Sequence, residues 1–181
     1  MNIRLCKMTK SLCRQYMQGF RMDPDLFLDM ANFKEYEYSD EKSDAHVDRY
    51  AQLGRVYLAV MLGDRPIGEV ILKNIDYIQK CCTLGIHLQN DSVKNKGFGT
   101  QAEILALDYA FNIMNMEIVY ADAIHKNRRS QHVMEKVGFC KIGVDDQFTY
   151  YQCEKSRWKR PRLLCPAVEY ADSAVLSYYS I

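Results

Sequence analysis

The sequence of 181 residues lacks any long apolar run, and no stretch approaches the roughly 18 residues that a membrane-spanning helix needs. Its first residues, Met1 to Cys6, lack the apolar core of a secretory signal peptide. The net charge is only +1, which disfavours a nucleic-acid binder that relies on an overall basic surface. These absences predict a cytoplasmic protein that binds neither membrane nor nucleic acid.

Metal-binding and disulfide patterns are also missing. The seven cysteines include no Cys-x-x-Cys pair, and the neighbours Cys81 and Cys82 are poorly placed to bond each other. Free thiols of a reducing compartment, without a metal site, are therefore expected. A cysteine nucleophile stays open, although no pattern places a histidine or a helix N-terminus beside one.

What is present is the composition of one globular domain, 48% hydrophobic and 26% charged. Alternating apolar residues predict strands at 3–5, 55–62, 67–72, 83–88, 118–121, 139–144 and 148–154. Helical spacing and capping residues predict helices at 9–20, 43–53, 100–114 and 130–136, with 74–82 as a connection. The fold class is therefore mixed, with both α-helices and β-strands.

The stretch from Val93 to Ala102 joins a predicted strand to a predicted helix through a basic, glycine-rich turn. Gly97 and Gly99 let the backbone turn tightly and bring its N–H groups close to an anion. The first turn of the helix adds unpaired N–H groups and the positive end of its dipole. Lys94 and Lys96 add charge, so this turn is predicted to bind a pyrophosphate.

The turn alone does not identify the ligand. A Walker loop is excluded, because its glycine spacing and its Gly-Lys-Ser/Thr ending are absent. A dinucleotide fingerprint of the form Gly-x-Gly-x-x-Ala is satisfied by Ala102, and Asp122 lies near the distance at which an acidic residue is expected. The motif does not open the first strand–helix–strand unit, however, which counts against this alternative.

A second motif, Asn127-Arg128-Arg129-Ser130 followed by Glu135-Lys136-Val137-Gly138-Phe139, decides between these alternatives. Together the two segments resemble the GNAT acetyltransferase family, in the branch of ribosomal-protein N-terminal and spermidine acetyltransferases. The resemblance covers roughly residues 66–158 in detail, on two motifs in the family's order and spacing, and residues before 66 fit in pattern only. It implies a mixed, mostly antiparallel sheet of about six to seven strands with about four helices, splayed at the acetyl-CoA site.

The resemblance also implies the cofactor site. Acetyl-CoA would be the acyl donor, and no metal is implied. The expected donor-binding residues are His87, Leu88, Gln89, Lys94, Asn95, Lys96, Gly97, Phe98, Gly99, Thr100, Asn127 and Ser130. Turn and N-cap chemistry is the alternative role for Asn127 and Ser130.

The catalytic groups do not transfer from the family. Many members have a tyrosine four residues before the glycine of Gly-Phe, and this chain has Met134 there, which cannot donate a proton. Tyr151 is the substitute that we consider as acid, with Tyr150 and Cys140 as alternatives. Glu69 and His87 are the candidates for the base, because each lies on a strand near the expected cleft. A core or paired role is the alternative for both, and a water chain to a distant carboxylate could also serve.

Two further regions bear on substrates and partners. Residues 23–48 contain nine acidic residues and two lysines, so this segment could attract a cationic amine, or it could be an ordinary solvated surface. The family domain is expected to span 1–158. An extension over 159–181 is expected to pack on the domain or on a second subunit, which would make a homodimer.

The resulting hypothesis is an acetyl-CoA-dependent N-acetyltransferase, an acyltransferase that acts on a polyamine, a small amine or a protein N-terminus. The alternatives are a CoA-binding module without turnover, acting as a sensor or partner subunit, and a dinucleotide or ATP protein.

Overall fold

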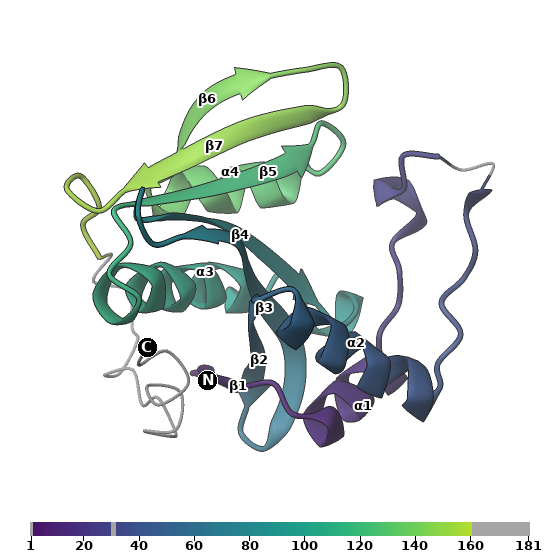
Figure 1. Cartoon of the computed structure of the whole chain (residues 1–181). Coiled ribbons are helices and arrows are strands. Elements are labelled where there is room, and N and C mark those ends of the chain that lie inside the picture. The colour runs from purple at the N-terminus through teal and green to yellow at the C-terminus, as the bar shows by residue number, and fades with distance from the viewer. Residues whose placement is uncertain (1, 30–31, 161–181) are drawn as a thin grey trace.

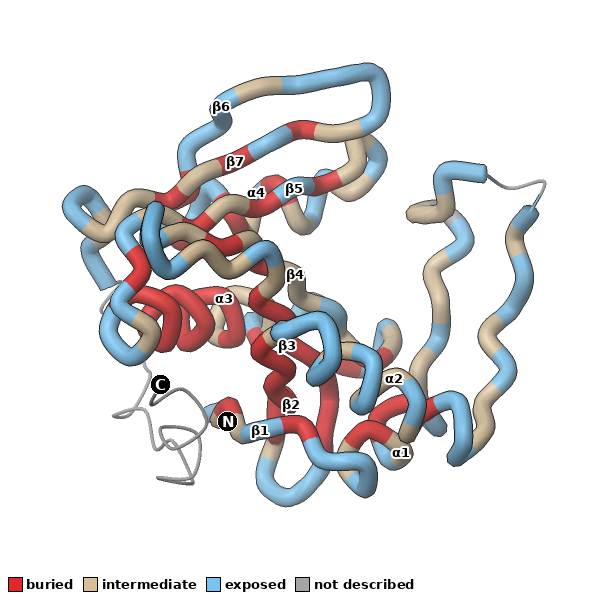
Figure 2. The backbone as a smooth tube through the Cα atoms, in the orientation of Figure 1, coloured by how far each residue is buried: buried red, intermediate tan, exposed pale blue. Residues whose placement is uncertain are grey.

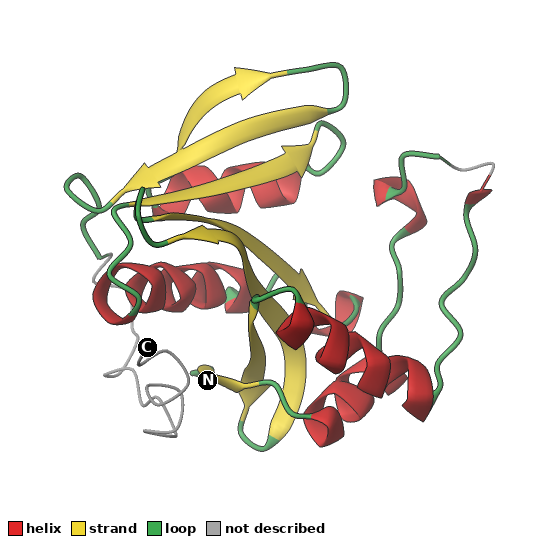
Figure 3. Cartoon of the chain, in the orientation of Figure 1, coloured by secondary structure: helices red, strands yellow, loops and turns green. Residues whose placement is uncertain are grey.

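The protein is a seven-stranded sheet with helices on both faces (Figure 1). The computed structural model describes residues 2–29 and 32–160. The strands are β1 Arg4–Lys7, β2 Val56–Leu62, β3 Arg65–Asp76, β4 Cys81–Leu88, β5 Ile118–Ile124, β6 Cys140–Val144 and β7 Phe148–Glu154. The helices are α1 Lys10–Gln18, α2 Asp40–Gln52, α3 Phe98–Asp108 and α4 Arg128–Val137 (Figure 3). Short 3-10 helices lie at η1 Pro24–Leu26 and η3 Asp91–Val93, and the π-helical segment η4 Tyr109–Ile113 continues α3.

The strand order is β1-β2-β3-β4-β5-β7-β6. Among the described strands every neighbouring pair is antiparallel except β4 and β5. This mixed sheet with four α-helices confirms the predicted fold class. From position 161 onward the predicted extension lies outside the described residues, and so does its expected packing.

Alternation along the strands builds two cores, one on each face of the sheet (Figure 2). On one face α3 and α4 cover the larger core, and on the other α1 and α2 cover the smaller one. Strand β2 contributes to both faces, with Val56, Leu58 and Val60 in the larger core and Tyr57, Ala59 and Met61 in the smaller one.

Capping side chains fix where three of the helices begin. Thr9 accepts the N–H of Leu12, as expected for α1. Ser39 accepts the N–H of Lys42, so α2 begins at Asp40, three residues before the predicted start. Asn127, rather than the predicted Ser130, caps α4. Side-chain oxygens of this kind satisfy N–H groups that would otherwise have no partner in the first turn.

The predicted connection at 74–82 is wrong. Strand β3 continues to Asp76, and β4 begins at Cys81, so the two strands form a tight hairpin. The carboxylate of Asp76 accepts the N–H groups of Ile78 and Gln79, both at 2.8 Å, which fixes the turn. The polar residues at the end of β3 gave no apolar alternation, so the strand was missed there.

The sheet opens between β4 and β5 (Figure 1). These two strands pair only where Cys81 to Thr83 lie beside Ile118 to Tyr120. Beyond Thr83, β4 pairs with β3 alone, and β5 continues beside β7. The expected splay is therefore present, and backbone groups on the inner edges of both strands are left for another partner. None of the described helices combines the length and apolarity needed to cross a membrane.

Candidate acetyl-CoA and catalytic site

The turn before α3 has the geometry of an anion site. Gly97 occupies the N-cap position with φ of +79°, a left-handed conformation that glycine adopts without strain, and no side chain caps the helix there. The first helical hydrogen bond runs from Gln101 N to Gly97 O at 3.0 Å. The N–H groups of Phe98, Gly99 and Thr100 therefore precede the helical ladder and are available to a phosphate.

Lys94 lies in this loop, but its ammonium group already has partners. Its Nζ lies 2.8 Å from Asp91 Oδ1 and 3.5 Å from Asp23 Oδ2, and the side chain is only 15% exposed. This ion pair lowers the pKa of Asp91 below its ordinary value. Lys96 is exposed. The predicted charge contact from Lys94 would thus require a change of partner, whereas Lys96 is accessible.

The side chain of Gln89 ties this loop to the end of α1. It is 2% exposed, its Nε2 donates to Tyr16 O at 2.7 Å, and its Oε1 accepts from Arg65 at 3.0 Å. Asn90 Nδ2 donates to Gly19 O at 2.8 Å. Sequence reasoning proposed Gln89 for its backbone, and the structure places its side chain as an anchor.

The second motif lies on α4, which follows β5. Asn127 Oδ1 accepts the N–H of Ser130 at 3.1 Å, so the side chain of Asn127 serves as the helix cap. Arg129, which sequence reasoning missed, contributes to lowering the pKa of Asp91, after the larger effect of Lys94. The start of α4 therefore lies near enough to the loop before α3 for the charges of Arg129 and Asp91 to interact. The two adjacent arginines within the motif were the available signal.

Glu69 and His87 are brought together by the register of β3 and β4, where they are direct cross-strand partners. Glu69 is 6% exposed, and its Oε1 lies 3.0 Å from His87 Nδ1. The other oxygen, Oε2, accepts the hydroxyl of Tyr57 at 2.6 Å. The His87 side chain is 59% exposed, and its hydrogen bond to the Glu69 carboxylate raises the pKa of His87. Tyr57 is a member of this site that sequence reasoning missed.

Tyr151 lies elsewhere, on β7. It is 1% exposed, and burial, followed by the nearby Glu135, raises the pKa of its phenol. It borders a cavity of about 240 Å³ at the point where β4 and β5 separate. The cavity is also lined by Lys73, Thr83, Tyr120, Asp122 and Tyr150.

The alternatives to Tyr151 are in less favourable positions. The exposed Tyr150 donates its hydroxyl to Asp145 at 2.5 Å. Met134, which occupies the family's tyrosine position and cannot donate a proton, is buried in the larger core. Cys140 is exposed.

A cysteine nucleophile and a metal site both find less support within the described residues. Burial raises the pKa of the thiols of Cys13, Cys82 and Cys153 to about 11, about 12 and about 12, which disfavours the thiolate that a nucleophile needs. Among the same residues, no three or more metal-ligating side chains form a group that could hold an ion.

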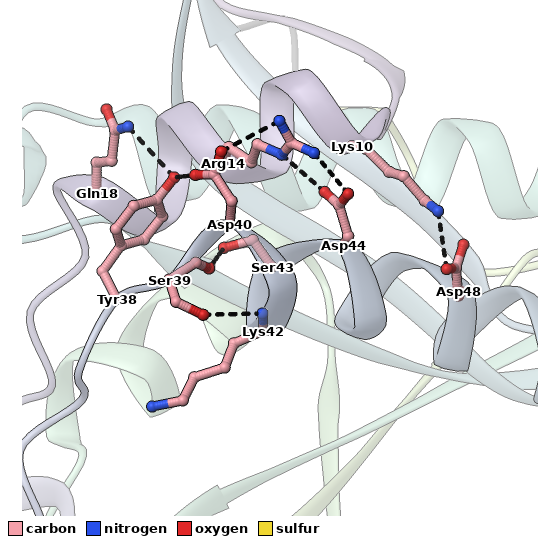
Figure 4. A network of polar contacts seen from close by, with 10 residues as sticks. All are labelled: Lys10, Arg14, Gln18, Tyr38, Ser39, Asp40, Lys42, Ser43, Asp44 and Asp48. Atoms are coloured by element: carbon pink, nitrogen blue, oxygen red, sulfur yellow. Dashed lines mark hydrogen bonds and ion pairs between the residues drawn. The ribbon is translucent and has the colours of Figure 1, made fainter.

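The acidic segment divides into two parts. On α2, Asp40, Asp44 and Asp48 recur every four residues and face α1 (Figure 4). Arg14 contacts Asp40 at 3.2 Å and Asp44 at 2.6 Å, and Lys10 contacts Asp48 at 2.8 Å. These three carboxylates join the two helices and are not free for a ligand. The exposed acidic side chains of the segment that have no ion pair among the described residues include Glu35, Glu37 and Glu41.

A splayed sheet with an uncapped helix N-terminus beside the opening is the arrangement of a protein that binds a phosphate-bearing ligand. Comparison with known proteins then specifies the family. The profile described as Acetyltransferase (GNAT) domain matches residues 3–140. The chain therefore belongs to the GNAT acetyltransferase family, a family of acyltransferases that use acetyl-CoA.

Individual relatives are more distant. Spermidine N(1)-acetyltransferase of Vibrio cholerae serotype O1 (strain ATCC 39315 / El Tor Inaba N16961) is 32% identical over 77 residues, which is 42% of this chain. The match spans 44% of that relative, less than half its length. A solved structure of an acetyltransferase from T. thermophilus aligns with a TM-score of 0.72 at 20% identity, over 87% of this chain and 88% of that chain.

The dodecameric spermidine N-acetyltransferase from Vibrio cholerae aligns with a TM-score of 0.66 at 19% identity. That alignment covers 86% of this chain and 95% of the other. Identities this low establish the shared fold alone.

Proposed function

We propose that this chain transfers the acetyl group of acetyl-CoA directly to a primary amine. The uncapped N-terminus of α3 beside the opening between β4 and β5 is the observation that carries the proposal. The N–H groups of Phe98, Gly99 and Thr100 would hold the pyrophosphate, with Lys96 adding charge. The inner edge of β4, at Leu88 and the residues before it, offers backbone groups to pantetheine.

His87 is the group best suited to accept the proton of the attacking amine. When Glu69 accepts a hydrogen bond from Nδ1–H, the tautomer of His87 is fixed and Nε2 carries the free lone pair. As the amine nitrogen bonds to the thioester carbon, the C–S bond breaks and the amine proton passes to Nε2. The departing thiolate then needs a proton, and Tyr151, which burial keeps protonated, is the candidate donor.

A polyamine is the acceptor that we favour. The exposed carboxylates of Glu35, Glu37 and Glu41 would attract a polycation, because opposite charge raises its local concentration. The relative that acts on spermidine is consistent with this choice. A small amine and a protein N-terminus are the other acceptors to compare. A dimer formed through the C-terminal segment remains part of the proposal.

The test is release of the CoA thiol from acetyl-CoA in the presence of spermidine, spermine, small primary amines and a peptide with a free N-terminus. We expect release with at least one amine, and a large loss of kcat in His87→Gln with acetyl-CoA binding retained. Tight acetyl-CoA binding without release for any amine would instead support a CoA-binding module, which the buried Met134 at the family's tyrosine position favours.

A further inference from the structure

Tyr57 completes a chain of hydrogen bonds that begins inside the protein and ends at an exposed histidine. Its hydroxyl donates to Glu69 Oε2 at 2.6 Å, and Glu69 Oε1 lies 3.0 Å from His87 Nδ1. Tyr57 is 7% exposed and Glu69 is 6% exposed, whereas the side chain of His87 is 59% exposed. Three adjacent strands, β2, β3 and β4, each supply one of the three residues.

We propose that Tyr57 is a positioning residue, which holds the side chain of Glu69 against His87 and thereby sets the pH at which His87 accepts a proton from the amine. This inference rests on the proposed function. It assigns a role to a residue that touches neither substrate, because Tyr57 contacts Glu69 and acts only through it.

The reason lies in the burial of the carboxylate. A buried charge is costly unless hydrogen bonds or an opposite charge compensate it. In the described residues the ion pairs include none between Glu69 and a lysine or arginine, so Tyr57 and His87 are its hydrogen-bond partners. With Tyr57 in place, Glu69 Oε2 accepts its hydroxyl and Glu69 Oε1 is directed at the imidazole of His87.

Within the described part of the protein, the side chains around Tyr57, Glu69 and His87 include no second hydroxyl that donates a hydrogen bond to Glu69. The titratable side chains that face these three residues are Cys13 and Tyr16 from α1, His46 and Tyr50 from α2, and Lys73 from β3. Burial raises the pKa of both tyrosines and of Cys13 and lowers the pKa of His46, so these four groups are neutral near pH 7. Lys73 is positive and acts weakly against the protonation of His87.

Removing the Tyr57 hydroxyl with Tyr57→Phe should change the pKa of His87 in one direction. The carboxylate then depends on His87 alone, which favours the protonated imidazole, so the pKa of His87 rises further. The acid limb of the kcat/KM profile should move to higher pH by about one unit, which corresponds to the loss of one hydrogen bond to a charged group. The rate should recover as the pH is raised above the new limb.

Glu69→Gln shifts the limb in the opposite direction. Without the carboxylate the pKa of His87 falls back toward its ordinary value of 6.5, so the acid limb should move to lower pH. Tyr57→Phe made in the Glu69→Gln background should then have no further effect on the limb. Tyr50→Phe is the matched control, because its ring packs 4.9 Å from that of Tyr57 and no hydrogen bond joins it to Glu69.

The experiment combines pH profiles of kcat/KM with an NMR titration of His87 in the free protein. Opposite shifts in Tyr57→Phe and Glu69→Gln, with none in Tyr50→Phe, would support the inference. A loss of rate that is equal at every pH, or an unchanged His87 titration in a folded Tyr57→Phe protein, would overturn it. Because the titration needs no turnover, failure of the proposed acetyl transfer would be seen separately, as absent thiol release by the unsubstituted protein.

Discussion

The N-terminus of α3 can be tested with a pair of substitutions at Gly99 that have the same shape but different charge. A Cβ at Gly99 would meet only Leu88 Cδ1, at 3.8 Å, which is an ordinary contact. Its φ lies outside the left-handed range, in contrast to the +79° of Gly97. Asparagine and aspartate can therefore both be placed there without backbone strain, and their comparison isolates the effect of charge.

The two variants should differ in opposite directions for stability and for binding. In the free protein, aspartate in the first turn of a helix is stabilising by about 0.3–1 kcal/mol through the helix dipole. In the complex the same carboxylate would face a pyrophosphate. Like charges about 4 Å apart repel by about 1 kcal/mol in water and about 4 kcal/mol near a protein surface. We therefore expect Gly99→Asp to bind acetyl-CoA about 10- to 100-fold more weakly than Gly99→Asn.

Calorimetry gives the Kd of each variant for acetyl-CoA, and thermal unfolding of the same free variants gives their stability, so both predicted changes are measured on the same samples. The difference between the two variants should shrink as salt is raised, because ions screen the repulsion. Gly99→Ala measures the cost of the added Cβ alone. If Gly99→Asp and Gly99→Asn bound acetyl-CoA equally at low salt, the pyrophosphate would not lie at this helix end, and the assigned site would be wrong.

Three further substitutions test other features. Burial raises the pKa of Glu103 from 4.5 to about 8, so the free energy of unfolding should fall by about 3 kcal/mol as the pH rises from 4.5 to 7. Denaturant titrations of Glu103→Gln should show that this pH dependence is abolished. Arg14 lowers the pKa of Asp44, so their ion pair stabilises the fold above pH 3.8, the ordinary carboxyl pKa, and this stabilisation is lost as the pH falls below that value. The difference in Tm between the unsubstituted protein and Arg14→Met should therefore shrink below pH 3.8, and a constant difference would contradict the pairing. Asp23→Asn removes one of the two carboxylates that hold Lys94, and calorimetry should show acetyl-CoA binding about two- to five-fold tighter. Unchanged binding would show that Lys94 does not reach the ligand.

Local chemistry made the glycine-rich turn before α3 predictable from sequence. Left-handed backbone favours glycine, and Gly97 and Gly138 both occupy left-handed positions at helix ends. The pairing of strand, basic turn and helix depends on neighbours in the chain, so the motif shows it directly. The cap of α4 was placed three residues too late, because Asn127 and Ser130 are both good N-cap residues and sequence alone does not choose between them.

Contacts between distant parts of the chain could not be predicted in this way. Tyr57 meets Glu69 only because β2 and β3 pair in one particular register, and a shift of one residue would turn its ring to the other face. The ion pair of Lys94 with Asp23 likewise joins two segments that are separated in the sequence by α2 and three strands. Charge composition showed an acidic segment, but not that α1 neutralises much of it.

These long-range contacts make the donor loop and the proposed acceptor side one connected unit. Gln89 binds the loop after β4 to the end of α1, and a Cβ added at Gly19 would lie 2.5 Å from Gln89 Nε2, so a side chain there would displace the Gln89 amide. Asp23, a few residues further on, holds Lys94. Any ligand that draws Lys94 toward its phosphates must therefore release Asp23, which lies in the segment that leads to Glu35, Glu37 and Glu41. If acetyl-CoA draws Lys94 away in this manner, donor binding would be coupled to the position of Asp23 through a single ammonium group.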